Sequence, residues 1–187
     1  MNNKITVVTV TFNAKNNFEK TILSVINQND IELEYIIIDG GSNDGTIEII
    51  NKYKNNIFYC ESTPDRGIYD AMNKSLKHAT GNWIIFMNAG DIFFNNYVLS
   101  KIFSNILLEK SKYDIVYSNH SFNYKQKIII KYPYPLKAIW KKMPICHQSI
   151  IMKTKLLKNY QFNLKYKFCA DYFLIYSAYL NSNLKLL

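Results

Sequence analysis

The stretch Ile5–Phe12, with the sequence ITVVTVTF, decides the fold of this chain. It is a continuous run of mostly β-branched residues, which is typical of a strand buried on both faces of a parallel sheet. After the polar turn at 13–17, the apolar residues Phe18, Ile22 and Val25 recur at helical spacing. A buried strand followed by a helix with one apolar face is the repeating unit of an α/β fold.

The same unit repeats through the first half of the chain. Further strands are predicted at 35–38, 57–60 and 83–87, and helices are predicted from 46 to about 53 and from 68 to about 79. This order predicts a Rossmann-like α/β fold with a mainly parallel central sheet and flanking helices. Right-handed crossovers bring the C-terminal ends of all these strands to one edge of the sheet, where open α/β sheets bind ligands.

The second half of the chain is less regular. The elements predicted there are a helix near 98–110, strands near 114–122, 127–132 and 147–153, and a closing helix around 170–180. No linker or domain boundary is recognisable. The last residues, 184–187, are typical of the start of another strand, which indicates a domain truncated at its C-terminus.

The composition excludes several classes of protein. Hydrophobic residues make up 48% of the 187 residues, enough for a sizeable core, but no stretch is long and apolar enough to span a bilayer. The N-terminus, MNNKITVV, has no signal-peptide pattern, so a soluble cytoplasmic protein is expected. Cys60, Cys146 and Cys169 are scattered without a CxxC spacing, which argues against a disulfide framework or a zinc site.

Charge is unevenly distributed along the chain. Residues 1–100 contain 8 Lys or Arg and 11 Asp or Glu, whereas residues 101–187 contain 15 and 3. A basic half is typical of contact with an anionic membrane surface or nucleic acid, and a coding bias toward lysine explains it equally well. Because no nucleic-acid-binding motif accompanies the charge, no nucleic acid partner is expected.

Two common nucleotide-binding motifs do not fit the turns. A dehydrogenase would carry G-x-G-x-x-G after the first strand, where this chain has the glycine-free turn FNAKNN. A P-loop needs G-x-x-x-x-G-K-[ST], and the spacing of Gly40, Gly41 and Gly45 does not match it. Both kinds of nucleotide site are therefore disfavoured.

Four ordered motifs instead resemble a known family. They are TVTFNA, IIIDGGSNDGT, DRGIYDAMNKSL and GNWIIFMNAGD. In this order they are similar to the inverting family 2 nucleotide-sugar glycosyltransferases, which have the A-type glycosyltransferase fold. The most similar forms belong to the bacterial branch that builds surface polysaccharide, such as lipopolysaccharide or capsule. The resemblance is strong over about 4–95 and continues more weakly through CHQS at 146–149 and CADY at 169–172.

The resemblance also implies how the chain is organised. It predicts a single glycosyltransferase domain over 1–187, in which 1–95 bind the nucleotide sugar and 96–187 face the acceptor.

The resemblance assigns nucleotide contacts to side chains that follow the strands. Asp39 would accept a hydrogen bond from the base, although an Asp at this position also caps a glycine-rich turn. Thr11 and Asn13 would contact the base, and both also suit the end of a strand. Asn88 would contact the ribose or hold its own turn.

Two further nucleotide contacts are predicted around the start of the third helix. Arg66, the only arginine in the chain, would stack on the nucleotide or pair with a phosphate, and its alternative is an ion pair with Asp65. Asp70 would lie near the ribose or a phosphate, and its alternative is a solvated position on the helix, where it shares a face with Asn73.

Asp91 is the predicted metal ligand. Members of this family usually carry Asp-x-Asp at this turn, whereas here Asn88 and Gly90 stand where acids are common. A hard divalent cation, Mn²⁺ or Mg²⁺, prefers oxygen ligands, and a diphosphate can supply those that the protein does not. The alternatives for Asp91 are an N-cap for the next helix or a turn-forming role.

Asp171 in FCADYF matches the family's catalytic base by order and context. As a lone carboxylate among aromatic residues, it is expected to have a raised pKa. Its alternative is a helix N-terminal acid that faces the macrodipole. His147 is expected to be a buried structural histidine.

Taken together, the motifs predict a metal-dependent inverting hexosyl- or N-acetylhexosaminyltransferase. It would move a sugar from a UDP or GDP sugar to a hydroxyl of a glycan or lipid-linked acceptor, and it would contact the inner face of the membrane peripherally. Two alternatives stay open: a catalytically inactive nucleotide-sugar-binding domain, and a nucleotidyltransferase or dehydrogenase built on a similar sheet.

Overall fold

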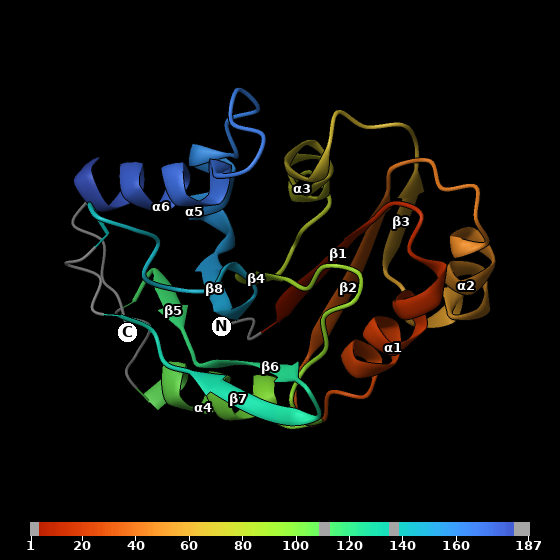
Figure 1. Cartoon of the computed structure of the whole chain (residues 1–187), viewed down its shortest axis with the longest axis horizontal. Coiled ribbons are helices and arrows are strands. Elements are labelled where there is room, and N and C mark those ends of the chain that lie inside the picture. The colour runs from red at the N-terminus through yellow and green to blue at the C-terminus, as the bar shows by residue number, and fades with distance from the viewer. Residues whose placement is uncertain (1–3, 109–112, 135–138, 182–187) are drawn as a thin grey trace.

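The computed structural model describes residues 4–108, 113–134 and 139–181, and its centre is a six-stranded sheet (Figure 1). The strand order is β3-β2-β1-β4-β8-β5. The strands are β1 (Ile5–Thr11), β2 (Leu33–Asp39), β3 (Tyr59–Ser62), β4 (Trp83–Phe86), β5 (Ile115–Tyr117) and β8 (Ile150–Lys153). Strands β1 to β4 are parallel, and β8 runs antiparallel to both β4 and β5. The predicted α/β fold with a mainly parallel sheet is confirmed.

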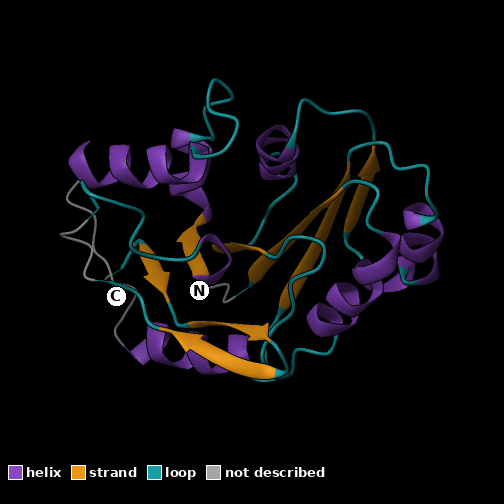
Figure 2. Cartoon of the chain, viewed as in Figure 1, coloured by secondary structure: helices purple, strands orange, loops and turns teal. Residues whose placement is uncertain are grey.

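Helices cover both faces of the sheet (Figure 2). The α-helices are α1 (Lys15–Ile26), α2 (Thr46–Lys52), α3 (Ile68–Leu76), α4 (Val98–Leu108), α5 (Thr154–Tyr160) and α6 (Ala170–Asn181). Val8 and Val10 of β1 pack with residues of α3, α5 and α6, whereas Ile5 and Val7 pack with residues of α1, α2 and α4. This alternation explains why the run at the start of the chain contains almost no exposed position.

Three smaller elements complete the described part of the chain. Short 3₁₀ helices span Lys54–Asn56 and His147–Ser149. The strands β6 (His120–Tyr124) and β7 (Lys127–Lys131) form a separate antiparallel hairpin. In the described ranges, no helix combines the length and the apolar character needed to cross a membrane.

The second half differs from the sequence prediction in several details. The strand predicted at 114–122 is divided into β5 and β6, which belong to different sheets. The strand predicted at 147–153 begins with a 3₁₀ turn, and α5 was not predicted because only Thr154 and Leu157 of this short helix are buried. The further strand predicted at 184–187 lies outside the described residues.

A buried carboxylate links β1, β2 and the turn before β4. Glu34 is 2% exposed and accepts hydrogen bonds from Thr6 Oγ1 and the Thr80 N–H, both at 2.8 Å, and from the Thr80 hydroxyl. Lys4 Nζ lies 3.0 Å from Glu34 Oε2. Burial alone would raise the pKa of Glu34, but these donors outweigh burial and lower the pKa.

We expect Glu34→Ala to lower the free energy of unfolding by about 2–4 kcal/mol at neutral pH, because the buried donors lose their acceptor. Since the folded-state pKa lies below the unfolded one, this stabilisation is present above about pH 4.3 and is lost as the pH falls through the folded-state pKa. Urea denaturation of both proteins at neutral and acidic pH measures this. Glu32→Ala, at an exposed neighbouring position, is the control, and an equal loss in both variants would contradict the prediction.

Candidate active site

The polar turns that follow β1, β2 and β4 are held together at one edge of the sheet. The Gly40 N–H donates to the Thr11 carbonyl at 2.9 Å, which joins the ends of β2 and β1. On the other side of β1, the Ala89 N–H donates to the Val10 carbonyl at 3.3 Å. We call this edge, together with the turn after β3, the strand-end rim. It contains the sequence motifs that follow the parallel strands.

Asp39, at the end of β2, organises its own turn. The side chain is fully buried, and Oδ2 accepts hydrogen bonds from the Gly41 N–H at 2.9 Å, the Ser42 N–H at 2.8 Å and Ser62 Oγ at 2.7 Å. Oδ1 accepts from Ser42 Oγ at 2.5 Å. These donors occupy the capacity of a carboxylate, so the geometry supports the turn-capping alternative. Direct base recognition by Asp39 stays a prediction.

We expect Asp39→Ala to lower the free energy of unfolding by about 2–4 kcal/mol, because buried donors of the turn would lose their acceptor. Urea denaturation measures this loss, and calorimetric titration with UDP and GDP measures nucleotide affinity separately. Unchanged stability with weakened nucleotide binding would instead assign Asp39 to base recognition alone.

Asn13 ties the turn after β1 to the turn after β2. Its N–H donates to Ser42 Oγ at 2.7 Å, and its Oδ1 accepts the Asn43 N–H at 3.0 Å. Its φ of 48° lies in the left-handed region, which Asn adopts more readily than most residues. Thr11 Oγ1 is buried and has no hydrogen-bond partner within the described structure. Thr11 therefore offers a polar atom at the rim, whereas the Asn13 Oδ1 is already engaged.

Arg66 pairs with Asp70 and not with Asp65, so the ion pair considered from the sequence was assigned to the wrong partner. Arg66 Nη2 lies 3.0 Å from Asp70 Oδ1, and the Arg66 N–H donates to Asp70 Oδ2 at 3.1 Å. The hydrogen bond from Arg66 is the main cause that lowers the pKa of Asp70. Asp65 instead accepts the Gly67 N–H at 2.8 Å. The Arg66 side chain remains 76% exposed and accessible to a phosphate.

Asn73 connects α3 to the second half of the chain. Its Nδ2 donates to the Phe162 carbonyl at 2.8 Å, and its Oδ1 accepts the Phe162 N–H at 2.9 Å. Both ends of the amide are thus used in one backbone contact, which fixes α3 against the segment that precedes α6.

Asp171 lies in the first turn of α6 and has two close neighbours. Tyr69 Oη donates to Asp171 Oδ1 at 2.8 Å, and His147 Nδ1 lies 3.3 Å from Asp171 Oδ2. Burial alone would raise the pKa of Asp171, but His147 and Tyr69 outweigh burial and lower it. The expectation of a raised pKa was therefore wrong, because it treated Asp171 as a lone carboxylate.

His147 is largely buried between aromatic rings, and its Nε2 is buried without a hydrogen-bond partner in the described structure. The ring centroid of Phe86 lies 5.8 Å from that of His147. His147 was expected to be structural, yet it faces Asp171 and keeps a nitrogen free. It is a candidate site residue that the sequence argument had set aside.

Asp91 lies on the turn after β4, close to the segment that carries His147. Burial raises the pKa of Asp91, while a hydrogen bond from Gln148 and the charge of His147 act in the opposite direction. Since His147 also contacts Asp171, its charge acts on both acids. Asp91 lies well before α4, so it is not the N-cap of that helix.

The turn after β4 fits a cation that is completed by other ligands. Asn88 Oδ1 is buried without a partner in the described structure, and Asp91 supplies a carboxylate on the same turn. Among the residues that the structure describes, no group of three or more His, Cys, Asp or Glu side chains is arranged to hold a metal ion. Two oxygen ligands are compatible with Mn²⁺ or Mg²⁺ when a diphosphate supplies the others.

Phe12 and Asp65 flank Gly40 at the rim, and the sequence argument missed this pair. The Phe12 side chain is 63% exposed, and a Cβ added to Gly40 would lie 2.7 Å from Asp65 Oδ2 and 3.3 Å from the Phe12 ring. An exposed ring can stack on a base, and a carboxylate beside it can accept a hydrogen bond from an N–H of that base. An aromatic residue directly after the first strand was the available signal.

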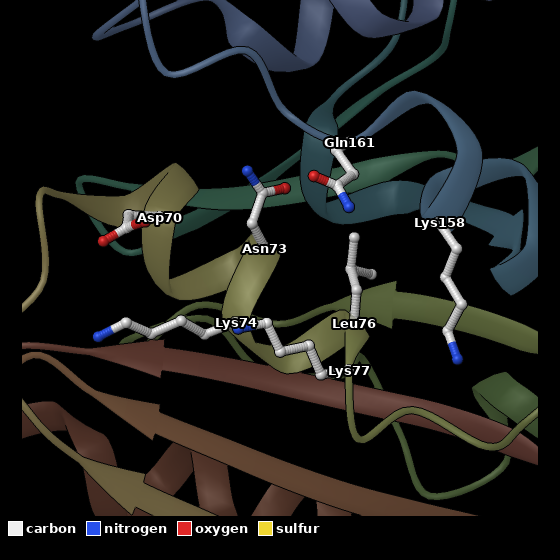
Figure 3. Close-up of a pocket in the computed structure, with 7 residues that line it drawn as sticks. All are labelled: Asp70, Asn73, Lys74, Leu76, Lys77, Lys158 and Gln161. Atoms are coloured by element: carbon white, nitrogen blue, oxygen red, sulfur yellow. The ribbon is translucent and has the colours of Figure 1, made fainter.

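A cavity of about 340 Å³ lies beside α3 and α5 (Figure 3). Its lining residues are Asp70, Asn73, Lys74, Leu76, Lys77, Lys158 and Gln161. Of the predicted site residues, only Asp70 lines it. Asp39, Asp91 and Asp171 do not, so this cavity is not the candidate active site.

Comparison with known proteins gives a family match over most of the chain. Residues 6–179 match the family described as Glycosyl transferase family 2. A PGL/p-HBAD biosynthesis glycosyltransferase of Mycobacterium bovis is 30% identical over 156 residues, which span 80% of this chain and 59% of that protein. A cholesterol galactosyltransferase of Borreliella burgdorferi is 30% identical over 141 residues, 71% of this chain and 38% of that protein. The chain thus spans less than two thirds of these relatives.

Solved structures share the fold. S. aureus TarS in complex with UDP superposes with a TM-score of 0.79 at 22% identity. The superposed region spans 98% of this chain and 57% of the TarS chain. The mannosyltransferase PcManGT from Pyrobaculum calidifontis, in complex with GDP-Man and Mn²⁺, gives a TM-score of 0.63 at 19% identity over 86% of this chain and 47% of its own. Together with the sequence match over residues 6–179, these likenesses lead to one conclusion: the chain belongs to glycosyl transferase family 2.

Proposed function

We propose that this chain is an inverting glycosyltransferase that moves a sugar from a nucleotide diphosphate sugar to a hydroxyl of a glycan or lipid-linked acceptor. The observation that carries the proposal is the pair of acids linked by one short segment. His147 contacts Asp171, and the charge of His147 also acts on the pKa of Asp91, which supports a base and a diphosphate-side acid on either side of one short segment.

Asp171 acts as the base. As the acceptor oxygen attacks the anomeric carbon, the hydroxyl proton passes to a carboxylate oxygen of Asp171, and the bond to the nucleotide diphosphate breaks on the opposite face of the sugar. Tyr69 holds Asp171 Oδ1 at 2.8 Å, which leaves Oδ2, on the His147 side, to receive the proton. The lowered pKa keeps Asp171 ionised at neutral pH, as a base requires.

The diphosphate is held at the turn after β4. Asp91 and Asn88 would hold Mn²⁺ or Mg²⁺, which, when bound, neutralises the charge that develops on the departing diphosphate. Arg66 pairs with Asp70, but its side chain is largely exposed, and we assign to it a contact with a phosphate. PcManGT was solved with GDP-Man and Mn²⁺, which supports a donor and metal of this kind.

The nucleotide is held along the rest of the rim. Thr11 offers an unpaired hydroxyl, and Asn13 shapes the turn beside it. We assign base stacking to Phe12 and acceptance of a base N–H to Asp65, and we retain Asp39 as the residue that fixes the turn. Asp70 orients Arg66. The complexes of TarS with UDP and UDP-GlcNAc support a uridine donor with an N-acetylhexosaminyl group, and that of PcManGT with GDP-Man supports a guanosine donor with a hexosyl group.

The acceptor is proposed to be lipid-linked, within cell-surface polysaccharide or glycolipid biosynthesis. The relatives named for PGL/p-HBAD biosynthesis and for cholesterol galactosyl transfer support a glycosylated lipid. We further propose that the domain works at the cytoplasmic face of the membrane, because the second half of the chain is strongly basic.

A nucleotide-sugar-binding domain without catalysis is the second candidate. It is favoured by one observation, the lack of a three-residue metal cluster among the described residues. Thermal-shift measurements with UDP-GlcNAc, GDP-Man and NAD, each with and without Mn²⁺, distinguish the classes of ligand. Stabilisation by a nucleotide sugar together with Mn²⁺-dependent consumption of that donor supports the transferase. Stabilisation without consumption supports the binding domain, and stabilisation by NAD alone would favour a dehydrogenase.

A further inference from the structure

A two-stranded hairpin forms a separate surface on this protein. β6 and β7 pair with each other and, in the part of the chain that is described, with no other strand. The hairpin lies along the lower edge of the molecule in Figure 1, apart from the strands of the six-stranded sheet. We call β6, β7, the turn between them, and residues 132–134 and 140–142 the hairpin surface.

Large apolar side chains are exposed on the hairpin surface. Seven of them are between 43% and 71% exposed: Phe122, Tyr124, Ile128, Ile130, Tyr132, Tyr134 and Trp140. Folded domains bury most such residues, and a group of exposed large apolar side chains marks an interaction site. The contact of Lys142 with the Tyr134 ring joins residues 140–142 to residues 132–134. Phe122 pairs with Ile129 across the hairpin, so Ile128 and Ile130 lie on the opposite face. Both faces of the hairpin therefore present apolar groups to the surroundings.

The charge on this surface has one sign. The hairpin surface contains five lysines and no acidic residue: Lys125, Lys127, Lys131, Lys141 and Lys142. The excess extends beyond the hairpin, since residues 115–170 contain 11 lysines and no Asp or Glu. The partner of this surface must therefore be anionic as well as apolar.

Two lysine ammonium groups on this surface lie over aromatic rings. Lys142 Nζ lies 3.6 Å from the centroid of the Tyr134 ring, and Lys141 Nζ lies 4.7 Å from the centroid of the Trp140 ring. Aromatic rings with a polar edge and lysines whose aliphatic stems are buried are both suited to the headgroup region of a bilayer. The headgroup region of a bilayer would therefore suit both the aromatic rings and the lysines.

We propose that the hairpin surface docks on a lipid bilayer that contains anionic phospholipids. Lysines attract anionic headgroups, and exposed Trp, Tyr and Ile side chains enter the boundary between headgroups and acyl chains. A second copy of this chain would bring two sets of lysines together, which is unfavourable. Nucleic acid would use the lysines but leave Ile128 and Ile130 in water.

The hairpin surface identifies residues for the membrane contact that is part of the proposed function. Docking of this surface on a bilayer does not require transferase activity. The assays below contain no sugar donor. Their failure would leave the proposed transferase untouched, and a protein that binds vesicles but transfers no sugar would leave the docking surface untouched.

Co-sedimentation with vesicles tests the cationic part of the proposal. The probes are vesicles of phosphatidylcholine alone and vesicles with equal amounts of phosphatidylcholine and phosphatidylglycerol. We expect the protein to sediment with the anionic vesicles, and the triple variant Lys125→Gln, Lys127→Gln, Lys131→Gln to bind them about 100-fold more weakly, at about fivefold per lysine.

A matched control removes the same charge elsewhere. Lys20→Gln, Lys54→Gln and Lys101→Gln together change three exposed lysines outside the hairpin surface. We expect this variant to retain binding within about fivefold of the unchanged protein. Equal weakening in the two triple variants, or equal binding to neutral and anionic vesicles, would overturn the proposal.

Tryptophan fluorescence tests the apolar part. The chain has two tryptophans, of which Trp83 is 5% and Trp140 is 67% exposed, so a vesicle-induced blue shift reports Trp140. We expect the shift with anionic vesicles and its loss in Trp140→Phe. The absence of a shift in the unchanged protein, or a dimer in sedimentation velocity that Ile128→Ser and Ile130→Ser together dissociate, would overturn bilayer docking.

Discussion

Asp171→Asn should slow sugar transfer about 100- to 10,000-fold, the range expected when a positioned general base is removed. The amide keeps the shape of the side chain but cannot take the proton of the attacking hydroxyl. Binding of the donor should change little, because the two contacts of Asp171 are with Tyr69 and His147, neither of which is assigned to the nucleotide. Initial rates with saturating donor, together with calorimetric titration of the donor, separate these two effects.

Two variants serve as controls for Asp171→Asn. Asp30→Asn makes the same chemical change at an exposed position with a φ of 57°, which Asn tolerates, and should leave the rate unchanged. Tyr69→Phe removes one of the groups that lower the pKa of Asp171, so the acidic limb of its pH–rate profile should move to higher pH. A rate for Asp171→Asn within threefold of the unchanged protein would exclude Asp171 as the base.

Asp91→Asn should lower donor turnover on the order of 100-fold and shift its Mn²⁺ dependence to higher concentrations. Asp91 is the only carboxylate on the turn after β4, so its loss leaves the cation with neutral protein ligands beside the diphosphate. Burial raises the pKa of Asp91, and a cation binds the ionised form, so Mn²⁺ affinity should fall as the pH is lowered through that pKa.

The Mn²⁺ titration is best measured as donor consumption and, independently, as thermal stabilisation by UDP-GlcNAc with and without the ion. Chelation of the metal should reduce the unchanged protein to the level of Asp91→Asn. If the midpoint of the Mn²⁺ titration is the same in both proteins, Asp91 does not bind the metal. Asp30→Asn again controls for the loss of one carboxylate.

The sequence predicted β1, β2 and β4 because almost every residue of these strands is buried, with alternate residues on opposite faces of the sheet. The run around Val8 shows this, since every position in β1 is buried. The strand predicted at 127–132 agrees with β7, but β6 was joined to β5 in one predicted strand and α5 was not predicted. β6 is mostly exposed and α5 buries only Thr154 and Leu157, so hydrophobic spacing did not define where either begins.

Positions along the chain were easier to predict than the partners of side chains. The turns that follow the strands were identified from Asp39 and Asp91, but the contact of Tyr69 with Asp171 joins residues that are 102 positions apart. The sign of the pKa shift of Asp171 depends on that contact and on His147, neither of which has a local sequence signal. Local sequence patterns therefore predicted the turns but not the direction of the pKa shift of Asp171.

The amide of Asn73 has a consequence for building chimeras. Helix α3 comes from the half of the chain predicted to hold the donor, yet Asn73 and Tyr69 bond it to Phe162 and Asp171 in the other half. An exchange of acceptor specificity by grafting a relative's C-terminal half at residue 95 would cut through these pairs. A functional hybrid must therefore take α3 from the same relative as the C-terminal half. The contacts of Asn73 and Tyr69 with that half would then be retained.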